Sequence, residues 1–242
     1  MRLPQFLCLP AYGVVLACSL AASAEGPTVA TLFNGRDLTG WRQPAGEWLA
    51  VEAVSLDPED DRKFIHHAGQ GVLVNGPTGR TVELLTESEH GDVEAHVEFV
   101  VPRGSNSGVY FQGRYEVQIF DSWGVDQPQH SDCGGIYERW SDGRGFDGHA
   151  PRMNASKPPG QWQSFHVIFR APRFDAAGRK TENARFVRVV HNGQLVHENV
   201  ELTGPTRAAH FADEQPTGPL MLQGTHGPVA YRNLRLTPRQ ID

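Results

Sequence analysis

The stretch RGSNSGVYFQGRYEVQIFD (residues 103–121) decides the fold. It contains two short strand-like runs, residues 107–112 and 114–120, which are joined by a glycine. In the second run, tyrosine, valine and isoleucine alternate with polar residues that include Glu116 and Gln118. Side chains alternate along a strand, so one face of this run suits a hydrophobic core while the other carries a carboxylate beside an amide. We predict a strand pair whose polar face is the working surface.

Similar short periodic runs follow one another along the whole chain. The clearest covers residues 92–101, where apolar and polar residues alternate as in a half-solvated antiparallel strand. Asn192 and Gly193 predict a two-residue hairpin turn. Further strands are predicted at residues 48–54, 71–74, 82–85, 161–170, 186–190, 195–200, 219–223 and 229–236. Residues 207–214 allow one short helix, and otherwise no helical period is sustained. The pattern predicts an all-β fold, a β-sandwich of jelly-roll type.

Composition limits the class of protein. The chain has 242 residues, with 26 glycines and 17 prolines, and its length suits a single large β domain. The net charge of −6 gives no basic stripe for nucleic acid or an anionic membrane surface. Cys8 and Cys18 lie in the N-terminal leader, which leaves Cys133 without a disulfide partner in the mature chain. Stability must therefore come from a hydrophobic core.

Residues 1–24 resemble a secretory signal peptide. Arg2 supplies the positive start, an apolar stretch follows, and Ala22-Ser23-Ala24 resembles a cleavage site. We therefore predict a mature domain of residues 25–242, with no integral membrane span, that is periplasmic or secreted. The run Val15-Leu16-Ala17-Cys18 also resembles a lipobox, so a lipid anchor at Cys18 on an outer-surface lipoprotein is the alternative.

The segment of residues 122–160 is long, irregular and rich in charged groups, which is typical of functional segments. Its candidate metal ligands are His130, Asp132, Cys133, Asp142, Asp147 and His149. None of them has a recognised zinc spacing, so the sequence leaves a divalent metal open. No nucleophile elbow, phosphate loop or dinucleotide fingerprint occurs in the sequence.

Seven motifs follow one another along the chain: LFNGRDLTGW (32–41), GDVEAHVEFVVPRGSNSGVYFQ (91–112), YEVQIFD (115–121), GGIY (134–137), KPPGQW (157–162), HNGQLV (191–196) and GPLMLQGTHGPVAYRNLRL (218–236). Together they resemble the 3-keto-disaccharide hydrolase domain family. The resemblance covers almost all of the mature chain. It implies a concanavalin-like sandwich of two curved antiparallel sheets, exported by bacteria. It also implies cleavage of glycosides that are already oxidised at C3. Because the chain lacks a dinucleotide fingerprint, an upstream sugar 3-dehydrogenase would have to supply that substrate.

A 3-keto sugar sets particular chemical needs. The ketone acidifies the C2 proton, so a base can form an enolate that expels the C1 leaving group, and water then adds to the enone. The site needs a base near C2, a donor or cation at the C3 oxygen, and an acid for the leaving oxygen. Glu116 is the first candidate for the base or a substrate ligand, although it would equally suit a solvated sheet face. His226, between the last two strands, is the candidate proton shuttle or a plain loop histidine.

Further polar residues are candidates for contacts to sugar hydroxyls and the carbonyl. They are Asn106, Arg114, Gln118, Asp121, Tyr137, Lys157 and Gln223. Asn106 would otherwise shape a turn, and Arg114 would pair with a neighbouring acid. Trp41 and Trp162 are predicted to lie in the core.

The sequence therefore predicts an exported enzyme that cleaves 3-keto-glycosides by elimination and hydration, with direct hydrolysis as another route. A non-catalytic, lectin-like glycan-binding module is the alternative of a different class. A structural domain without saccharide binding is the third.

Overall fold

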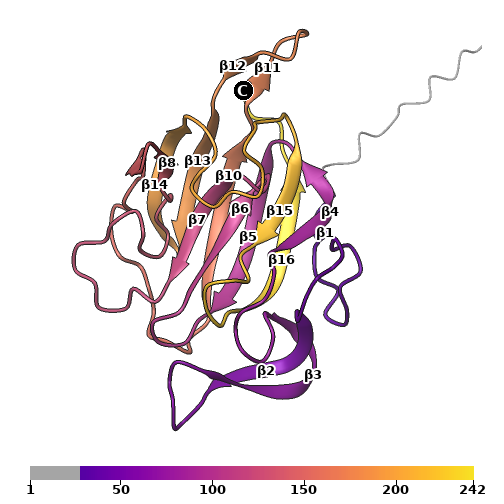
Figure 1. The fold of residues 1–242 in the computed structure, drawn as a ribbon, viewed down its shortest axis with the longest axis vertical. Coiled ribbons are helices and arrows are strands. Elements are labelled where there is room, and N and C mark those ends of the chain that lie inside the picture. Colours follow the sequence, from indigo (N-terminus) through magenta and orange to yellow (C-terminus); the bar gives the residue numbers. More distant parts are fainter. Residues whose placement is uncertain (1–27) are drawn as a thin grey trace, which may run out of the picture.

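A computed structural model of the protein describes residues 28–242 and contains only strands, turns and loops over that range. Two antiparallel sheets, one of eight strands and one of four, pack face to face (Figure 1). The predicted all-β sandwich is confirmed. The proposed signal peptide, the lipobox at Cys18 and the boundary between residues 24 and 25 lie outside the described residues.

The larger sheet carries the strands β1 (Ala30–Thr31), β2 (Leu49–Leu56), β3 (Phe64–Val74), β5 (Val93–Val100), β10 (Gln163–Arg170), β13 (Ala184–His191), β14 (Gln194–Leu202) and β16 (Ala230–Pro238). Their order is β14-β13-β10-β5-β16-β3-β2, and β1 pairs with β16 on the side of the path. The β13–β14 hairpin turns at Asn192 and Gly193, both at positive φ, as the Asn-Gly pair predicts.

The smaller sheet is β4 (Leu84–His90), β15 (Gly218–Leu222), β6 (Asn106–Phe111) and β7 (Tyr115–Phe120), in that order. Ile136 extends it beyond β7 through isolated bridges to Val117 and His149. Two small ribbons stand apart from the two sheets. They are β8 (Arg139–Ser141) with β9 (Arg144–Phe146), and β11 (Arg173–Phe174) with β12 (Lys180–Glu182).

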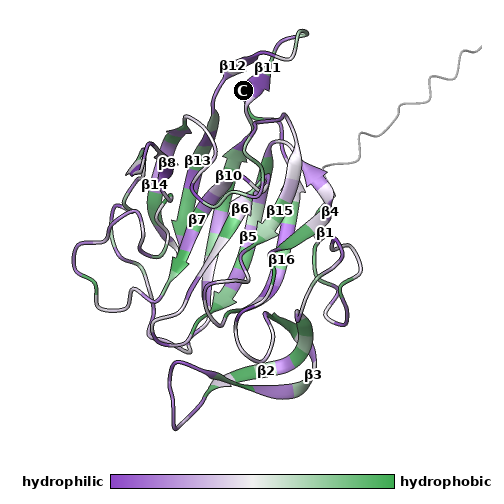
Figure 2. Cartoon of the chain, in the orientation of Figure 1, coloured by the Kyte–Doolittle hydropathy of each residue, from purple (hydrophilic) through white to green (hydrophobic). Residues whose placement is uncertain are grey.

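The core lies between the two sheets, where green apolar residues gather on the strands (Figure 2). Aromatic rings hold its centre, because Phe111 of β6 lies 5.2 Å from Phe169 of β10 and 5.3 Å from Phe186 of β13, between ring centroids. Val117 and Ile119 of β7 face this core and are fully buried. The predicted apolar face of residues 115–119 is therefore sealed against the larger sheet.

Most predicted strands agree with the observed ones apart from their ends, but the prediction at residues 71–74 covers only the last four residues of β3, and the one at residues 82–85 shares only two residues with β4. The ribbons β8–β9 and β11–β12 were not predicted. The short helix allowed at residues 207–214 is wrong, because that segment is a series of turns and bends. Trp41 is buried as predicted, whereas Trp162 is only partly buried and lies under the guanidinium of Arg232, 4.0 Å from its ring centroid.

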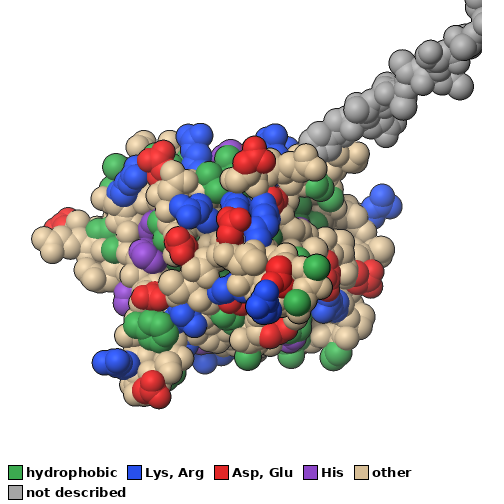
Figure 3. Space-filling model, turned by 90° about the horizontal axis from the view of Figure 1, so that it is seen from above, with side chains coloured by type: hydrophobic (Ala, Val, Ile, Leu, Met, Phe, Trp, Pro, Cys, Tyr) green, Lys and Arg blue, Asp and Glu red, His purple; other side chains and the backbone are tan. Residues whose placement is uncertain are grey.

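The surface carries mixed charge. Figure 3 shows acidic and basic side chains interspersed on the face seen from above, which is consistent with the net charge of −6. Within residues 28–242 no helix is long and apolar enough to cross a membrane.

Asn75 ties two loops together at one end of the sandwich. The two hydrogens of its buried side-chain amide are shared among the carbonyls of Gly79, Gly224 and Gly227, which lie 2.8–3.1 Å from Nδ2, and its oxygen accepts from the Val229 amide at 2.9 Å. One side chain thus fixes the loop between β15 and β16, which contains His226.

We expect Asn75→Ala to lower the free energy of unfolding by about 2–4 kcal/mol, because each buried group left unpaired costs about 1–3 kcal/mol. Asn75→Asp should cost at least as much, since it turns a second acceptor toward three carbonyls. Denaturant unfolding measures both, with Asn183→Ala as the control, because the Asn183 amide makes an exposed bond to Glu201. An Asn75→Ala protein as stable as the wild type would contradict the role.

Candidate functional site

The outer face of the four-stranded sheet carries polar groups where strand register brings them side by side. Tyr110 of β6 pairs with Glu116 of β7, and Gly108 pairs with Gln118. Directly paired residues share a face, so these side chains lie opposite the core. The polar face predicted from residues 114–120 is thus built as expected.

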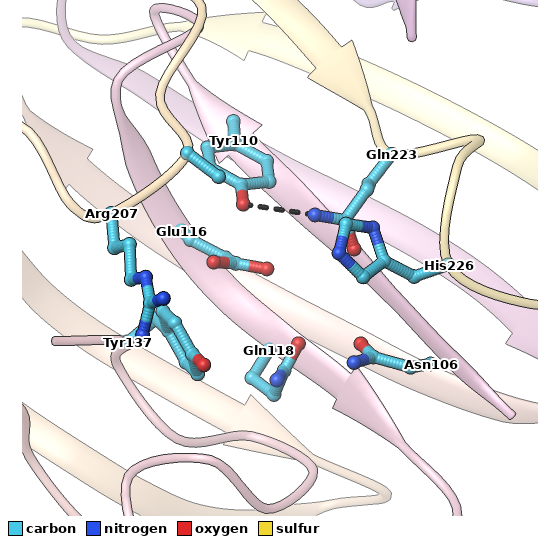
Figure 4. Close-up of a pocket in the computed structure, with 9 residues that line it drawn as sticks. Asn106, Tyr110, Glu116, Gln118, Tyr137, Arg207, Gln223 and His226 are labelled. Atoms are coloured by element: carbon cyan, nitrogen blue, oxygen red, sulfur yellow. Dashed lines mark hydrogen bonds between the residues drawn. The ribbon is translucent and has the colours of Figure 1, made fainter. Parts of the chain in front are cut away.

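A pocket of about 190 Å³ opens on this face. Strands β6 and β7, the β15–β16 loop and the turns near residue 207 contribute its walls, and Figure 4 shows their side chains turned toward a common space. It is lined by Asn106, Tyr110, Glu116, Gln118, Tyr137, Arg207, Ala208, Gln223 and His226. The pocket is smaller than the roughly 300–1,000 Å³ of pockets for drug-sized ligands, so its size suits one small polar unit.

Glu116 lies at the centre of the pocket and is only 2% exposed. Its carboxyl occupies space that Gly108 leaves free, because a Cβ at Gly108 would lie 2.1 Å from Glu116 Oε1. Burial raises the pKa of this carboxyl to about 8; hydrogen bonding by Tyr110 acts in the opposite direction, and the charge of Glu83 raises the pKa further. At neutral pH the Glu116 carboxyl is therefore mostly protonated, so it can donate a proton.

Three amide side chains surround this carboxyl. The side-chain oxygens of Asn106, Gln118 and Gln223 are buried and have no hydrogen-bond partner among the described residues. Gln223 does donate through Nε2 to the Tyr110 hydroxyl at 3.1 Å (Figure 4). Buried polar atoms are nearly always paired, so these three oxygens are acceptors open to water or to the hydrogen-bond donors of a ligand.

His226 faces the pocket from the β15–β16 loop. Its Nδ1 lies 2.8 Å from Thr225 Oγ1, and the Thr225 hydroxyl donates its single proton to Glu83 Oε1 at 2.9 Å. The hydroxyl oxygen must then accept the Nδ1 proton of neutral His226. This tautomer leaves Nε2 with a free lone pair, as a general base requires.

Arg207 supplies the cation of the pocket. Its backbone amide donates to the Glu138 carbonyl at 2.7 Å, and its guanidinium lies 3.9 Å from the centroid of the Trp140 ring. A second contact at 3.4 Å joins Nη1 to the Glu138 carboxylate. Because the irregular segment of residues 122–160 holds this arginine, its position is set by contacts between residues far apart in the sequence.

The structure brings six of the nine predicted site residues together, but not the other three. Arg114 does not line the pocket, because its guanidinium binds the Asp213 carboxylate and carbonyl and lies over the Phe211 ring. Asp121 accepts the backbone amide of Gly104, and the Lys157 ammonium donates to the Trp162 carbonyl. These three side chains therefore bind other parts of the protein and do not line the pocket.

Sequence reasoning missed Tyr110, Arg207 and Ala208. Strand alternation could have identified Tyr110, because it lies four residues after Asn106 and therefore on the same side of the predicted strand. Arg207 and Ala208 had none, since they were assigned to a possible helix. Ala208 has a φ of 61°, an uncommon conformation for a non-glycine residue, in the turn beside Arg207.

The candidate metal ligands of the long segment do not converge. No group of three or more His, Cys, Asp or Glu side chains with metal-binding geometry occurs in residues 28–242. Asp132 binds the Ser122 hydroxyl, and Asp147 accepts from Thr203. Burial raises the pKa of the Cys133 thiol to about 12, so the thiol stays protonated.

Comparison with known proteins gives a family and a fold. A family model described as a 3-keto-alpha-glucoside-1,2-lyase-like domain matches residues 28–237. Two crystal structures from Parabacteroides distasonis, provisionally described as glycosyl hydrolases, superpose with TM-scores of 0.65 and 0.56. The first is 22% identical in sequence, and the match covers 91% of this chain and 95% of the other chain. The second is 19% identical, and the match covers 88% of this chain and 100% of the other chain. At such identities the likeness shows the fold. No curated protein matches the sequence.

The protonation of Glu116 should appear in the pH dependence of stability. Its pKa rises from an ordinary 4.5 to about 8 on folding, so the wild type loses stability as pH rises through that window. Glu116→Gln has no such proton. We therefore expect its stability relative to the wild type to increase by roughly 3–5 kcal/mol between pH 4.5 and 8, at about 1.4 kcal/mol per pKa unit. Denaturant unfolding across pH measures this, and parallel curves would contradict it.

The tautomer of His226 can be tested through Thr225. Thr225→Val removes the acceptor for Nδ1–H, whereas Thr225→Ser keeps it. One lost hydrogen bond is worth about 1 kcal/mol, so the tautomer ratio of neutral His226 should shift about fivefold in the valine variant only. The ¹⁵N chemical shifts of the two ring nitrogens report that ratio directly. Equal ratios in all three proteins would rule out Thr225 as the anchor.

Proposed function

The chain belongs to the 3-keto-alpha-glucoside-1,2-lyase-like family, and we propose that it cleaves the glycosidic bond of 3-keto-glycosides by elimination followed by hydration. The family match supports a carbohydrate-active role. One observation carries the finer proposal: a buried carboxyl with a raised pKa and a histidine whose Nδ1 contacts Thr225 lie in the same pocket, among unpaired amide oxygens.

In the first step, His226 Nε2 removes the C2 proton, and the electrons move toward the C3 carbonyl to form an enolate. Arg207 supplies positive charge for the developing oxyanion, a role predicted for Arg114 or Lys157 from the sequence. The enolate then re-forms the ketone and expels the C1 oxygen, which takes the proton of Glu116. The raised pKa favours Glu116 as the acid of the proposed mechanism, in place of the predicted base.

In the second step, water adds across the C1–C2 double bond of the enone. The Glu116 carboxylate takes a proton from water as its oxygen bonds to C1, and protonated His226 returns a proton to C2. Both groups regain their starting states, and the sum of the two steps is hydrolysis. The unpaired oxygens of Asn106, Gln118 and Gln223 accept from sugar hydroxyls.

Direct displacement fits the pocket less well. Glycosidases of that kind use two carboxylates on opposite sides of the scissile bond. Among the described residues that line this pocket, Glu116 is the only carboxylate. Glu83, the nearest other one along the His226 relay, accepts from the Gly224 amide and the Thr225 hydroxyl. Elimination requires one acid and one base, which the pocket offers.

A lectin-like binding module remains the second candidate, because unpaired amide oxygens would equally bind sugar hydroxyls without turnover. It gives no reason for a buried ionisable carboxyl at the centre of the pocket. We also propose that the protein is exported, as its N-terminal sequence predicts, and that a separate sugar 3-dehydrogenase supplies the 3-keto substrate.

Glu116→Gln should lower turnover of a 3-keto-glucoside by about 10²–10⁴-fold, because the amide cannot protonate the leaving oxygen, and His226→Ala should lower it similarly. Release of the free sugar or the enone is followed spectroscopically and by mass spectrometry. Glu198→Gln, which changes an exposed glutamate paired with Arg152, is the matched control.

The two candidate functions give different outcomes. Tight binding of the 3-keto-glucoside without turnover by the wild type would favour the lectin. Full activity in Glu116→Gln would remove this carboxyl from the chemistry.

A further inference from the structure

A second hollow, of about 500 Å³, lies beside the pocket over the start of β4. Pro44, Val82 and Leu85 give it an apolar lining, and Val82 is 43% exposed there. The proposed mechanism uses none of these three residues, so the hollow is available for another part of the substrate.

The pocket and the hollow lie on the same sheet face. Met221 of β15 pairs with Tyr110 of β6 on one side and with Leu85 of β4 on the other. These three side chains form one buried cluster, against which Phe211 packs. Tyr110 lines the pocket and Leu85 lines the hollow, so a single row of side chains joins the two.

The same two segments also border both spaces. The turns near residue 207 give Arg207 to the pocket and His210 to the hollow. The β15–β16 loop gives His226 to the pocket and Thr225 to the hollow, and the two residues are joined by the 2.8 Å contact described above. The pocket and the hollow thus have two bordering segments in common.

The polar groups of the two spaces differ in a way that indicates different occupants. In the pocket, three amide oxygens have no partner among the described residues. In the hollow, Glu83 accepts two hydrogen bonds, Arg42 donates to the Thr86 carbonyl and to Glu89, and the Gln43 side-chain oxygen accepts from the Ala45 amide. Among the polar residues that line the hollow, only His210 has a side chain without a hydrogen bond to the described residues. Paired polar groups gain little from a hydroxylated ligand, whereas exposed valine and proline gain from contact with an apolar one.

We propose that the second hollow is the leaving-group subsite and that it selects 3-keto-glycosides with an apolar aglycone over those with a second sugar. This inference rests on the proposed function of the adjacent pocket. It names the substrate class that the hollow favours: alkyl, terpenoid or similar apolar alcohols, linked at C1.

A series of methyl, butyl and hexyl 3-keto-glucosides of one anomer tests the subsite. Their alcohols have similar leaving ability, so differences report binding. We expect kcat/KM of the wild type to increase from methyl to hexyl by up to about fourfold for each methylene that enters the hollow, which corresponds to about 0.8 kcal/mol per CH₂. The 3-keto-disaccharide should resemble the methyl glycoside.

Val82→Asp should flatten this increase and leave the methyl glycoside unaffected. Val29→Asp is the matched control, because Val29 is also exposed, at 52%, and lines neither space. Unfolding curves of both variants check that they fold.

The outcomes separate the two proposals. No turnover of any glycoside in the series by the wild type would overturn the proposed function. Turnover of the methyl glycoside with no increase along the series, or an increase that Val82→Asp preserves, would overturn the subsite alone.

Discussion

The buried carboxyl of Glu116 is the constraint on which the site depends. Strand β7 must seal the core with one face, so its other face holds the carboxyl against the opposite strand, where only a glycine leaves room. Burial keeps the proton on Glu116 at neutral pH, at a cost in stability whenever the group ionises. The hairpin of β6 and β7 thus provides both a core surface and a buried carboxyl whose pKa the fold raises.

The rest of the site follows from contacts between distant residues. His226 can present Nε2 because the Thr225 hydroxyl, which donates to Glu83, contacts its Nδ1. Asn75 in turn holds the loop that carries Thr225 and His226. A change far from the pocket can therefore alter the chemistry without removing any group from it. Hydrogen bonds join the turn of residues 75–79 to the β15–β16 loop, so the two segments form one unit.

Local patterns predicted much of this arrangement. Alternation along residues 115–120 identified Glu116 and Gln118, and the Asn-Gly pair located the β13–β14 turn. Arg207 could not be found this way, because a stacking contact with Trp140 and a backbone bond to Glu138 position it within irregular turns. Arg114 was wrongly predicted to line the site, because its place next to the hairpin turn suggests the polar face of β7. Its guanidinium instead pairs with Asp213, which is far away in the sequence. Strand periodicity encodes which face a residue occupies, but not which loop covers that face.

The protonation state of Glu116 also could not be read from the sequence, and it changes the chemistry. A carboxyl on a solvated sheet would be ionised and suited to be a base, as its residue type suggests. Loops and neighbouring strands exclude water and raise the pKa of this carboxyl, so in the proposed mechanism Glu116 is the acid, and the base is His226, which keeps contact with solvent. A substrate whose C2 proton is already acidified requires only a base of moderate strength, so a histidine suffices. The 3-keto group would thus supply the activation that a second buried carboxylate gives an ordinary glycosidase.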